Sequence, residues 1–279
     1  MNLLKIFERP KLHASWSYQT EGVIWRVLPS ASVLIGEERN LDSKQVSFFC
    51  LDATTGTPLW EHLTFDEQWW ISIEHVHNNV LFFHEFATPD LPDHKKIRAV
   101  QLDSGKTLWT NDEVQFAFAQ GTSVYVTKTG FEDRHYFEAD LLTGVITREI
   151  SYEEFAKLQS TSEPNDTDLT FSETYDGTQS WMSLLKGAIV KSLQNSVQTD
   201  YIEYGELFIF SIYLAESPTN ANVQTYNQQL IIVDKTGKQM FHEMLNTGMM
   251  YPVPDTLVCR GDMVYYIKNK TTLSAVHVQ

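Results

Sequence analysis

Short apolar segments separated by polar turns recur along the whole chain, and several of them alternate apolar with polar residues. Trp70–Val76 and Val80–Phe86 are two such segments, and the dipeptide Asn78-Asn79 lies between them. Alternation is typical of a β-strand with one buried face, and Asn-Asn suits a tight hairpin turn. Two further segments follow, Ile97–Leu102 and Thr107–Trp109. The pattern therefore predicts a four-stranded antiparallel sheet over this stretch.

A short sequence motif marks the end of each predicted sheet: an apolar strand, an Asp, a Gly, and a bulky residue four positions after the Gly. Its copies are Asp52, Gly56 and Trp60; Asp103, Gly105 and Trp109, with a turn interpreted as shortened; Asp140 and Gly144, with Arg148 in the bulky position; and Asp234 and Gly237, with Phe241. The first three glycines are 49 and 39 residues apart. A period of about 40–50 residues with several short strands is typical of β-propeller blades.

The same four-strand order fits three more stretches, Ile24–Trp60, Val114–Arg148 and Tyr201–Phe241. Residues Thr256–Val278 provide only three strands, and Ala14–Gln19 resembles a missing fourth, with Trp16 in the position of Trp60 and Trp109. Pairing the two ends would remove open sheet edges. We therefore expect one all-β domain over residues 1–279, a five-bladed β-propeller of four-stranded antiparallel blades whose ring is closed by the N-terminal strand.

Residues 151–199 lack the Asp–Gly motif and are predicted to be a partly helical insertion. Tyr152–Leu158 is helix-like, and the apolar residues of the second half approximate a 3.6-residue period: Trp181, Leu184, Leu185, Ile189 and Leu193. A degenerate sixth blade is the alternative interpretation of this stretch.

The repeated motif resembles the quinoprotein-type (PQQ-like) propeller repeat. The copy that matches it most fully contains Asp52, Thr55, Gly56 and Trp60. The resemblance implies that the Trp packs between neighbouring blades and that the Gly allows close approach. It also leads one to expect adjacent cysteines and a metal-binding set near the quinone, whereas Cys50 and Cys259 are far apart. We therefore predict no cofactor. As a whole, the chain looks most like a bacterial domain family of unknown function.

Composition narrows the possible partners. The chain has 36 acidic and 21 basic residues, a formal charge of −15, which argues against nucleic acid or an anionic membrane surface as the partner. No apolar run approaches ~18 residues and no signal peptide is recognisable, so we expect a cytoplasmic protein without membrane insertion. Both cysteines lie in apolar strand-like segments and are predicted to be buried free thiols. We expect a monomer.

Much of the negative charge falls on predicted loops at one end of the propeller. These loops carry −10 of the −15 charges and are Gly36–Gln45, Glu61–Trp69, Phe86–Ile97, Thr129–His135, Ser151–Gln198 and Leu214–Gln229. Long loops on a rigid scaffold are where binding residues concentrate. We therefore predict a non-enzymatic binding or scaffold protein that uses an acidic loop face for a protein or a small ligand. Its candidate binding residues are Asp66, Glu67, Trp69, Glu153 and Glu154.

Two other chemistries are considered. A carbohydrate-active enzyme or small-ligand binder could use the mouth of the central channel, with paired carboxylates and Trp69-Trp70 as a stacking surface, but the sequence identifies no catalytic residue. His75 and His77 share a strand face, and together with His84 they are the best metal-ligand candidates. No carboxylate spacing completes that set, so we predict that no metal ion is required for folding.

Overall fold

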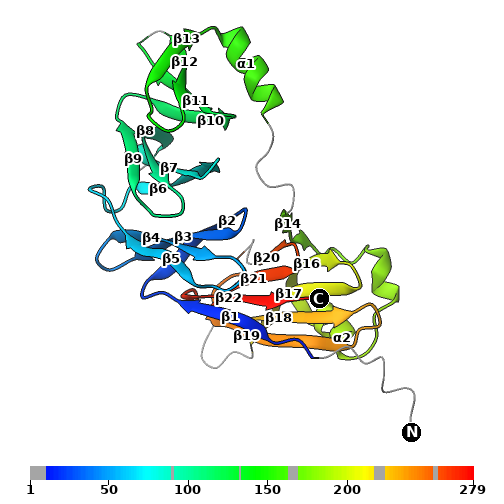
Figure 1. The fold of residues 1–279 in the computed structure, drawn as a ribbon. Helices are drawn as coiled ribbons and strands as arrows, with labels where there is room; N and C mark the ends of the chain where they lie inside the picture. Colours follow the sequence, from blue (N-terminus) through cyan, green and yellow to red (C-terminus); the bar gives the residue numbers. More distant parts are fainter. Residues whose placement is uncertain (1–10, 89–90, 132, 163–168, 217–223, 254–256) are drawn as a thin grey trace. The chain divides into compact units, whose positions relative to one another are not determined.

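A computed structural model describes residues 11–88, 91–131, 133–162, 169–216, 224–253 and 257–279 (Figure 1). The chain packs into two compact units. One is continuous and spans residues 21–167, and the other is split and combines residues 1–20 with 168–279. These are called the continuous unit and the split unit below.

The described residues of the continuous unit form three four-stranded antiparallel sheets, each built from strands that are consecutive in sequence. The first holds β2 (Val23–Ser30), β3 (Val33–Asn40), β4 (Gln45–Asp52) and β5 (Pro58–Leu63). The second holds β6 (Ile71–His77), β7 (Val80–Thr88), β8 (Leu91–Gln101) and β9 (Thr107–Asn111). The third holds β10 (Gln115–Gln120), β11 (Ser123–Thr129), β12 (Arg134–Asp140) and β13 (Ile146–Ile150), and helix α1 (Tyr152–Thr161) follows it.

In the split unit, the part of the chain that the structure describes forms two antiparallel sheets, each with one short extra strand at its edge. The first has the order β15 (Glu173–Thr174), β16 (Ser196–Tyr204), β17 (Leu207–Ala215), β18 (Tyr226–Asp234) and β19 (Gln239–Met249). The second has the order β1 (Ala14–Gln19), β22 (Thr272–His277), β21 (Met263–Lys268), β20 (Leu257–Arg260) and β14 (Leu169–Phe171). A 3₁₀ helix, Ser180–Ser183, and helix α2 (Ala188–Asn195) precede β16.

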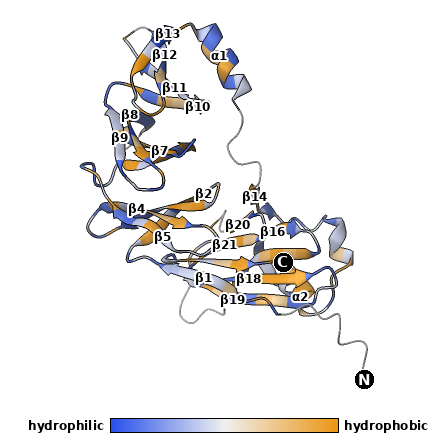
Figure 2. Ribbon diagram, viewed as in Figure 1, coloured by the Kyte–Doolittle hydropathy of each residue, from blue (hydrophilic) through white to orange (hydrophobic). Residues whose placement is uncertain are grey.

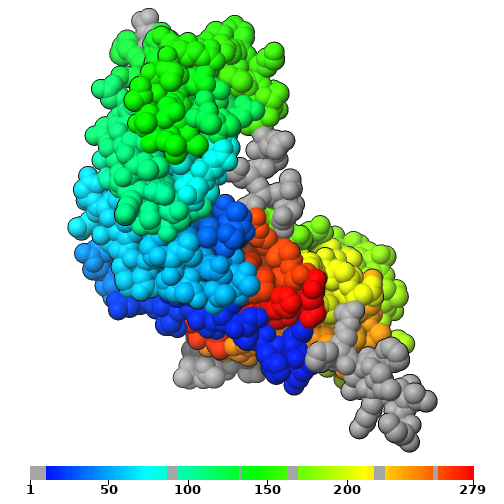
Figure 3. All heavy atoms as spheres, viewed as in Figure 1, coloured from blue at the N-terminus to red at the C-terminus, as the bar shows by residue number. Residues whose placement is uncertain are grey.

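Repeated four-stranded antiparallel sheets of this kind place the protein in the β-propeller class, which confirms the predicted fold class. The predicted use of the N-terminal strand is also confirmed, because β1 pairs with β22 and the Ser17 and Ser274 hydroxyl oxygens are 2.9 Å apart. In Figure 3 the blue N-terminal segment lies beside the red C-terminal one. The number of blades in a closed ring stays a prediction.

Apolar residues occur on most strands (Figure 2), and the buried ones form clusters between neighbouring sheets within each unit. Between the first two sheets of the continuous unit, the rings of Phe48 and Phe83 meet edge to face with centroids 4.6 Å apart. Cys50 belongs to the same core, and Cys259 lies in the core of the split unit. Both are buried free thiols, as predicted, and burial raises the pKa of each to about 12.

The repeat turns are held by their own side chains. Asp52 Oδ1 accepts the backbone N–H groups of Thr54 and Thr55, and two sheets later Asp140 Oδ1 accepts those of Leu142 and Thr143. The predicted shortening of the second turn is wrong. Gly105 N–H donates to the Gln101 carbonyl just as Gly56 N–H donates to that of Asp52, so the turns have equal length. Gln101, and not Asp103, therefore occupies the Asp position, and the turn from Asp234 to Gly237 is the shorter one.

The repeat tryptophans connect consecutive sheets of the continuous unit. The indole N–H of Trp60 donates to the Leu102 carbonyl (2.7 Å), and that of Trp109 donates to the Leu141 carbonyl (3.0 Å). In the split unit, the turn glycine Gly237 is approached by the backbone of Lys186 instead, whose carbonyl oxygen would lie 2.5 Å from an added Cβ. The segment before α2 therefore covers this turn, whereas an indole covers Gly105 and Gly144.

The predicted insertion contributes to both units. Helix α1 packs on the third sheet of the continuous unit through Phe155, whose ring lies 5.3 Å from that of Phe118. Trp181 and α2 pack on β16 and β17 of the split unit, with the Trp181 and Phe208 rings 4.9 Å apart. The helices lie where the periodicity predicted them, and β16 begins earlier than the predicted end of the insertion. No helix in the described part of the chain is both long and apolar enough to cross a bilayer.

Candidate metal centre

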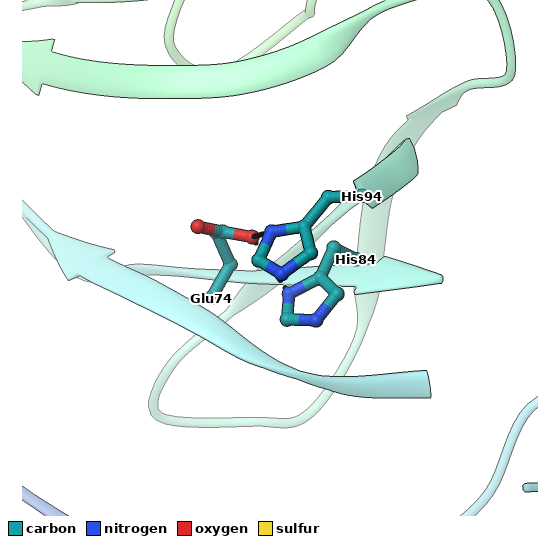
Figure 4. Close-up of side chains that lie close together, drawn as sticks. All are labelled: Glu74, His84 and His94. Carbon is teal, nitrogen blue, oxygen red and sulfur yellow. Dashed lines mark ion pairs between the residues drawn. The ribbon is translucent and has the colours of Figure 1, made fainter. Parts of the chain in front are cut away.

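Three side chains from adjacent strands of the second sheet converge on one point: Glu74 of β6, His84 of β7 and His94 of β8 (Figure 4). The Nδ1 atoms of His84 and His94 lie 2.6 and 2.8 Å from the same carboxylate oxygen, Oε2 of Glu74. The two imidazole rings are stacked, with centroids 3.4 Å apart and planes inclined by 7°. Their metal-ligating atoms all lie within 4.8 Å of one another.

A β-bulge positions Glu74. The register between β6 and β7 shifts from Ile73↔Phe83 to His75↔Phe82, so Glu74 is the extra residue on its strand. Strands β10, β16 and β2 of three other sheets also carry a one-residue bulge, although not all at the same distance from the following turn, and the extra residues are Ala117, Val197 and Trp25. Bulges commonly re-aim a side chain beside a functional site. Among these four described strands, β6 alone has an ionisable residue, Glu74, at its bulge.

A second bulge positions His94. His84 pairs with Ile97, but Phe86 pairs with His94, because Lys96 is accommodated as an extra residue with φ of 54°. His84 and Phe86 share one face of β7, since alternate residues of a strand point the same way. The shift therefore brings His94, and not Lys95, to the face that carries His84.

The cluster is largely shielded from water. The side chains of His84, Glu74 and His94 are 5%, 17% and 36% exposed, so the site opens on the side of His94. Although His84 Nδ1 lies close to Glu74 Oε2, the alignment is poor for a hydrogen bond. Both ring nitrogens of His84 and this oxygen lack a well-aligned hydrogen-bond partner among the described residues. Buried polar atoms without a partner are costly, and a bound ion is one way in which they are satisfied.

The protonation states suit a cation. Burial raises the pKa of Glu74, but the adjacent His84 and His94 outweigh burial and leave that pKa below its ordinary value. Burial lowers the pKa of His94, and the neighbouring His84 and Arg26 lower it further, against the opposing effect of Glu74. The site thus favours an ionised carboxylate and a neutral imidazole at His94, the forms that coordinate metal ions.

Two imidazoles and one carboxylate are the ligands of His₂Glu zinc sites and of related divalent transition-metal sites. Tetrahedral zinc with bonds of about 2.0–2.1 Å keeps its ligand atoms roughly 3.3 Å apart. The observed 2.6 and 2.8 Å separations are shorter, so binding requires the imidazoles to move outward from Glu74 by about half an ångström. Three protein ligands leave a fourth position for water or another ligand.

The sequence-based metal candidates are only partly brought together. His84 joins the cluster, but His75 packs beside the Phe116 ring at 5.2 Å, and His77 Nε2 lies 3.0 Å from the Gly121 carbonyl. Glu74 and His94 were missed. They are 10 residues before and after His84, which is no recognisable ligand spacing, and His94 fell in a predicted loop that is mostly strand β8.

Three of the acidic binding candidates have partners within the continuous unit. Asp66 forms ion pairs with Arg98 and Lys96, and Glu154 pairs with Arg148 at 2.8 Å. Glu67 Oε1 accepts the backbone N–H groups of Trp69 and Trp70, so this carboxylate stabilises a turn. Glu153 is exposed in the first turn of α1.

The aromatic and pocket candidates for carbohydrate binding are also partly occupied. The Trp69 ring has cations against it, Arg39 Cζ and Lys44 Nζ, each 4.8 Å from its centroid. A polar pocket of about 230 Å³ is lined by Glu21, Glu38 and Phe65, among others. Glu38 accepts hydrogen bonds from Gly22 N–H and the Ser47 hydroxyl, and Arg98 lies over the Phe65 ring. Carbohydrate chemistry stays a prediction.

The sequence model of one family, described as Domain of unknown function (DUF4905), matches residues 28–109. This stretch includes Glu74, His84 and His94. None of the curated proteins with which the sequence was compared matches it.

Several solved structures are similar in part. A eukaryotic initiation factor is 10% identical with a TM-score of 0.33, and the match covers 79% of this chain and 54% of that one. An uncharacterized protein from Listeria monocytogenes is 12% identical with a TM-score of 0.35, over 90% and 94% of the two chains. The β-propeller domain of a protease from Pyrococcus furiosus is 7% identical with a TM-score of 0.28, over 95% and 69%. This chain thus spans about half the length of the initiation factor, and no function is transferred from any of these matches.

Proposed function

We propose that the protein is a non-enzymatic binding module that holds a divalent transition-metal ion, zinc in the first instance, at Glu74, His84 and His94. The observation that carries the proposal is the convergence of three ligand side chains on a point where His84 is 5% exposed and lacks well-aligned hydrogen-bond partners among the described residues. Their donor types suit zinc. Sites on adjacent strands of a sheet are also held more precisely than sites on loops.

The proposed scaffold is a five-bladed propeller with quinoprotein-type turns, without a quinone. Support for the blade number comes from the five antiparallel sheets among the described residues and from the pairing of β1 with β22. Support for the repeat type comes from the hydrogen bonds that the repeat tryptophans donate to the turn of the next sheet. Strands β6–β8 are joined by backbone hydrogen bonds, so the metal ion is a ligand of a folded sheet and is not needed to form it.

The charge distribution supports attraction of a cation to this unit. Residues 21–167 hold 24 acidic and 11 basic residues, a formal charge of −13, whereas the rest of the chain holds 12 and 10, a charge of −2. A negative field raises the local concentration of cations. This long-range effect is unspecific, and selectivity for a transition metal rests on the imidazole ligands.

Calorimetric titration of the metal-free protein with zinc tests the proposal. We expect one site per chain, and we expect Glu74→Gln and His94→Ala each to weaken the affinity ~100-fold or more, since even outer partners of ligands are worth about 10–100-fold. The matched control is His77→Gln, on the same strand as Glu74 and outside the cluster. Equal zinc affinity for Glu74→Gln, His94→Ala and the wild type would exclude the site.

The acidic loop face is a second candidate, for recognition of a basic protein. The concentration of negative charge in residues 21–167 favours it. Glu153 is exposed and forms no ion pair with a described residue, whereas Asp66 and Glu154 already have basic partners. A pull-down from cell extract with the wild type and a variant carrying Glu153→Gln, Glu154→Gln, Asp66→Asn and Glu67→Gln tests this idea. Recovery of the same partners by both proteins would contradict it.

A further inference from the structure

An arginine lies beside the cluster without an acidic partner. Arg26 Nη1 donates a hydrogen bond to the carbonyl of Ile73, the residue directly before Glu74, at 2.7 Å. Its cross-strand neighbour Glu37 is already bonded to Arg39 and to the Ser72 hydroxyl, each at 2.6 Å. No carboxylate forms an ion pair with Arg26 among the described residues. Arg26 is an exposed residue, and its guanidinium has further N–H donors to offer.

The charges at the loaded site do not balance. The single carboxylate of Glu74 offsets one charge of a divalent ion, which leaves one positive charge at a mostly shielded cluster, and the exposed residue Arg26 adds a second one nearby. Shielding the excess charge of the ion from water is unfavourable unless an opposite charge accompanies it. Because only three protein side chains supply ligands, a tetrahedral ion also keeps one open position. An anion with two oxygen atoms can satisfy both requirements at once.

An aromatic strip leads from the cluster towards solvent. The Phe86 ring meets His84 and His94 edge to face, at centroid distances of 4.9 and 5.6 Å. The next ring, Trp70, lies 6.4 Å from Phe86 and is 39% exposed. An apolar group attached to a bound anion therefore has an aromatic surface to cover.

We propose that a carboxylate carrying an apolar group is the natural ligand of this site, with one oxygen on the metal ion and the other bonded to Arg26, and with its apolar part on Phe86 and Trp70. This inference rests on the proposed metal site. A planar carboxylate matches the fork of N–H donors on an arginine. The negative charge of the ligand offsets one of the two excess positive charges.

Cobalt-loaded protein provides the test, because the visible absorption of Co²⁺ changes when its coordination changes. The spectrum before any anion is added reports the metal site alone. Benzoate, acetate and inorganic phosphate are then titrated separately. We expect benzoate to bind more tightly than acetate or phosphate, and Arg26→Gln to weaken benzoate binding by about tenfold or more, as for loss of a charge-assisted hydrogen bond. Arg134→Gln, an exposed arginine on β12, is the matched control and should match the wild type.

Each outcome is decisive. Absence of a cobalt spectrum would overturn the metal site and the ligand together, and this is seen before any anion is added. A cobalt spectrum that none of the anions alters would overturn the ligand alone. Equal benzoate affinity for Arg26→Gln and Arg134→Gln would remove the role of Arg26. Trp70→Ala tests the apolar contact, since this substitution should abolish the tighter binding of benzoate relative to acetate. Phosphate binding as tight as that of benzoate would contradict a carboxylate as the natural ligand.

Discussion

The indole N–H of Trp109 donates to the carbonyl of Leu141, one sheet further along the chain, at 3.0 Å. The same ring covers the turn glycine Gly144, where an added Cβ would lie 2.4 Å from the indole carbon Cδ2. Trp60 makes the equivalent hydrogen bond to Leu102 and covers Gly105. The presence of Gly and Trp in the repeat is thus explained by contacts between consecutive sheets of the continuous unit, in which the Trp of one copy covers the Gly of the next.

Gly144→Ala should destabilise the protein by more than its backbone conformation alone predicts. Gly144 has φ of 68° and touches Trp109, whereas Gly121 has φ of 59° and has no atom within 4 Å of an added Cβ. Gly121→Ala therefore carries the backbone strain without the clash. We expect Gly144→Ala to lose about 1–3 kcal/mol more than Gly121→Ala in denaturant unfolding, the range for overpacking. Equal losses would show that the indole contact is unimportant.

Removal of residues 1–19 should expose an unpaired edge on β22. This truncation removes β1 with Trp16, which packs against Tyr265 at a ring distance of 6.1 Å. We expect a loss of at least about 2 kcal/mol from the aromatic contact, a lower melting temperature, and aggregation through the open edge. Removal of residues 1–10 retains β1 and is the control. A truncated protein as soluble and heat-stable as the control would contradict closure of this sheet by β1.

The strand pattern and the repeat turns made the sheets predictable, because alternation and Asp–Gly turns are local features. Gln101 was overlooked because Asp103, two residues later, resembles the repeat more closely, and only the backbone hydrogen bonds fix the alignment. The metal cluster was inaccessible for a related reason. Its three residues meet through two bulges, at Glu74 and Lys96, and a one-residue shift in register changes which side chains share a face.

The pKa of His135 should lie above its ordinary value. Its Nδ1 lies 2.8 Å from Glu149 and its Nε2 lies 3.2 Å from Asp133, and these carboxylates raise its pKa. Because the protonated form is favoured in the folded state, the stabilisation is complete below the unfolded-state pKa and is lost as pH rises through the folded-state pKa. An NMR titration should show a lower midpoint in Glu149→Gln and no change in Glu113→Gln. An unchanged midpoint in Glu149→Gln would refute the pairing.

Zinc should stabilise the protein without being needed for folding. At a free concentration 100-fold above the dissociation constant, binding to the folded state alone adds about 2.7 kcal/mol. We expect a higher melting temperature with zinc in the wild type and in His77→Gln, and no increase in Glu74→Gln. Circular dichroism of chelator-treated wild type should retain its strand signal. Loss of that signal at room temperature would mean that the ion is structural.

Zinc X-ray absorption of the loaded protein tests the central claim most directly, because it reports the atoms bound to the ion. The account predicts two imidazole nitrogens and carboxylate oxygen at about 2.0–2.2 Å, with the outer-shell scattering of imidazole reduced to one ring in His94→Ala and unchanged in His77→Gln. A first shell of oxygen atoms alone, or imidazole scattering that His94→Ala does not alter, would contradict coordination by Glu74, His84 and His94.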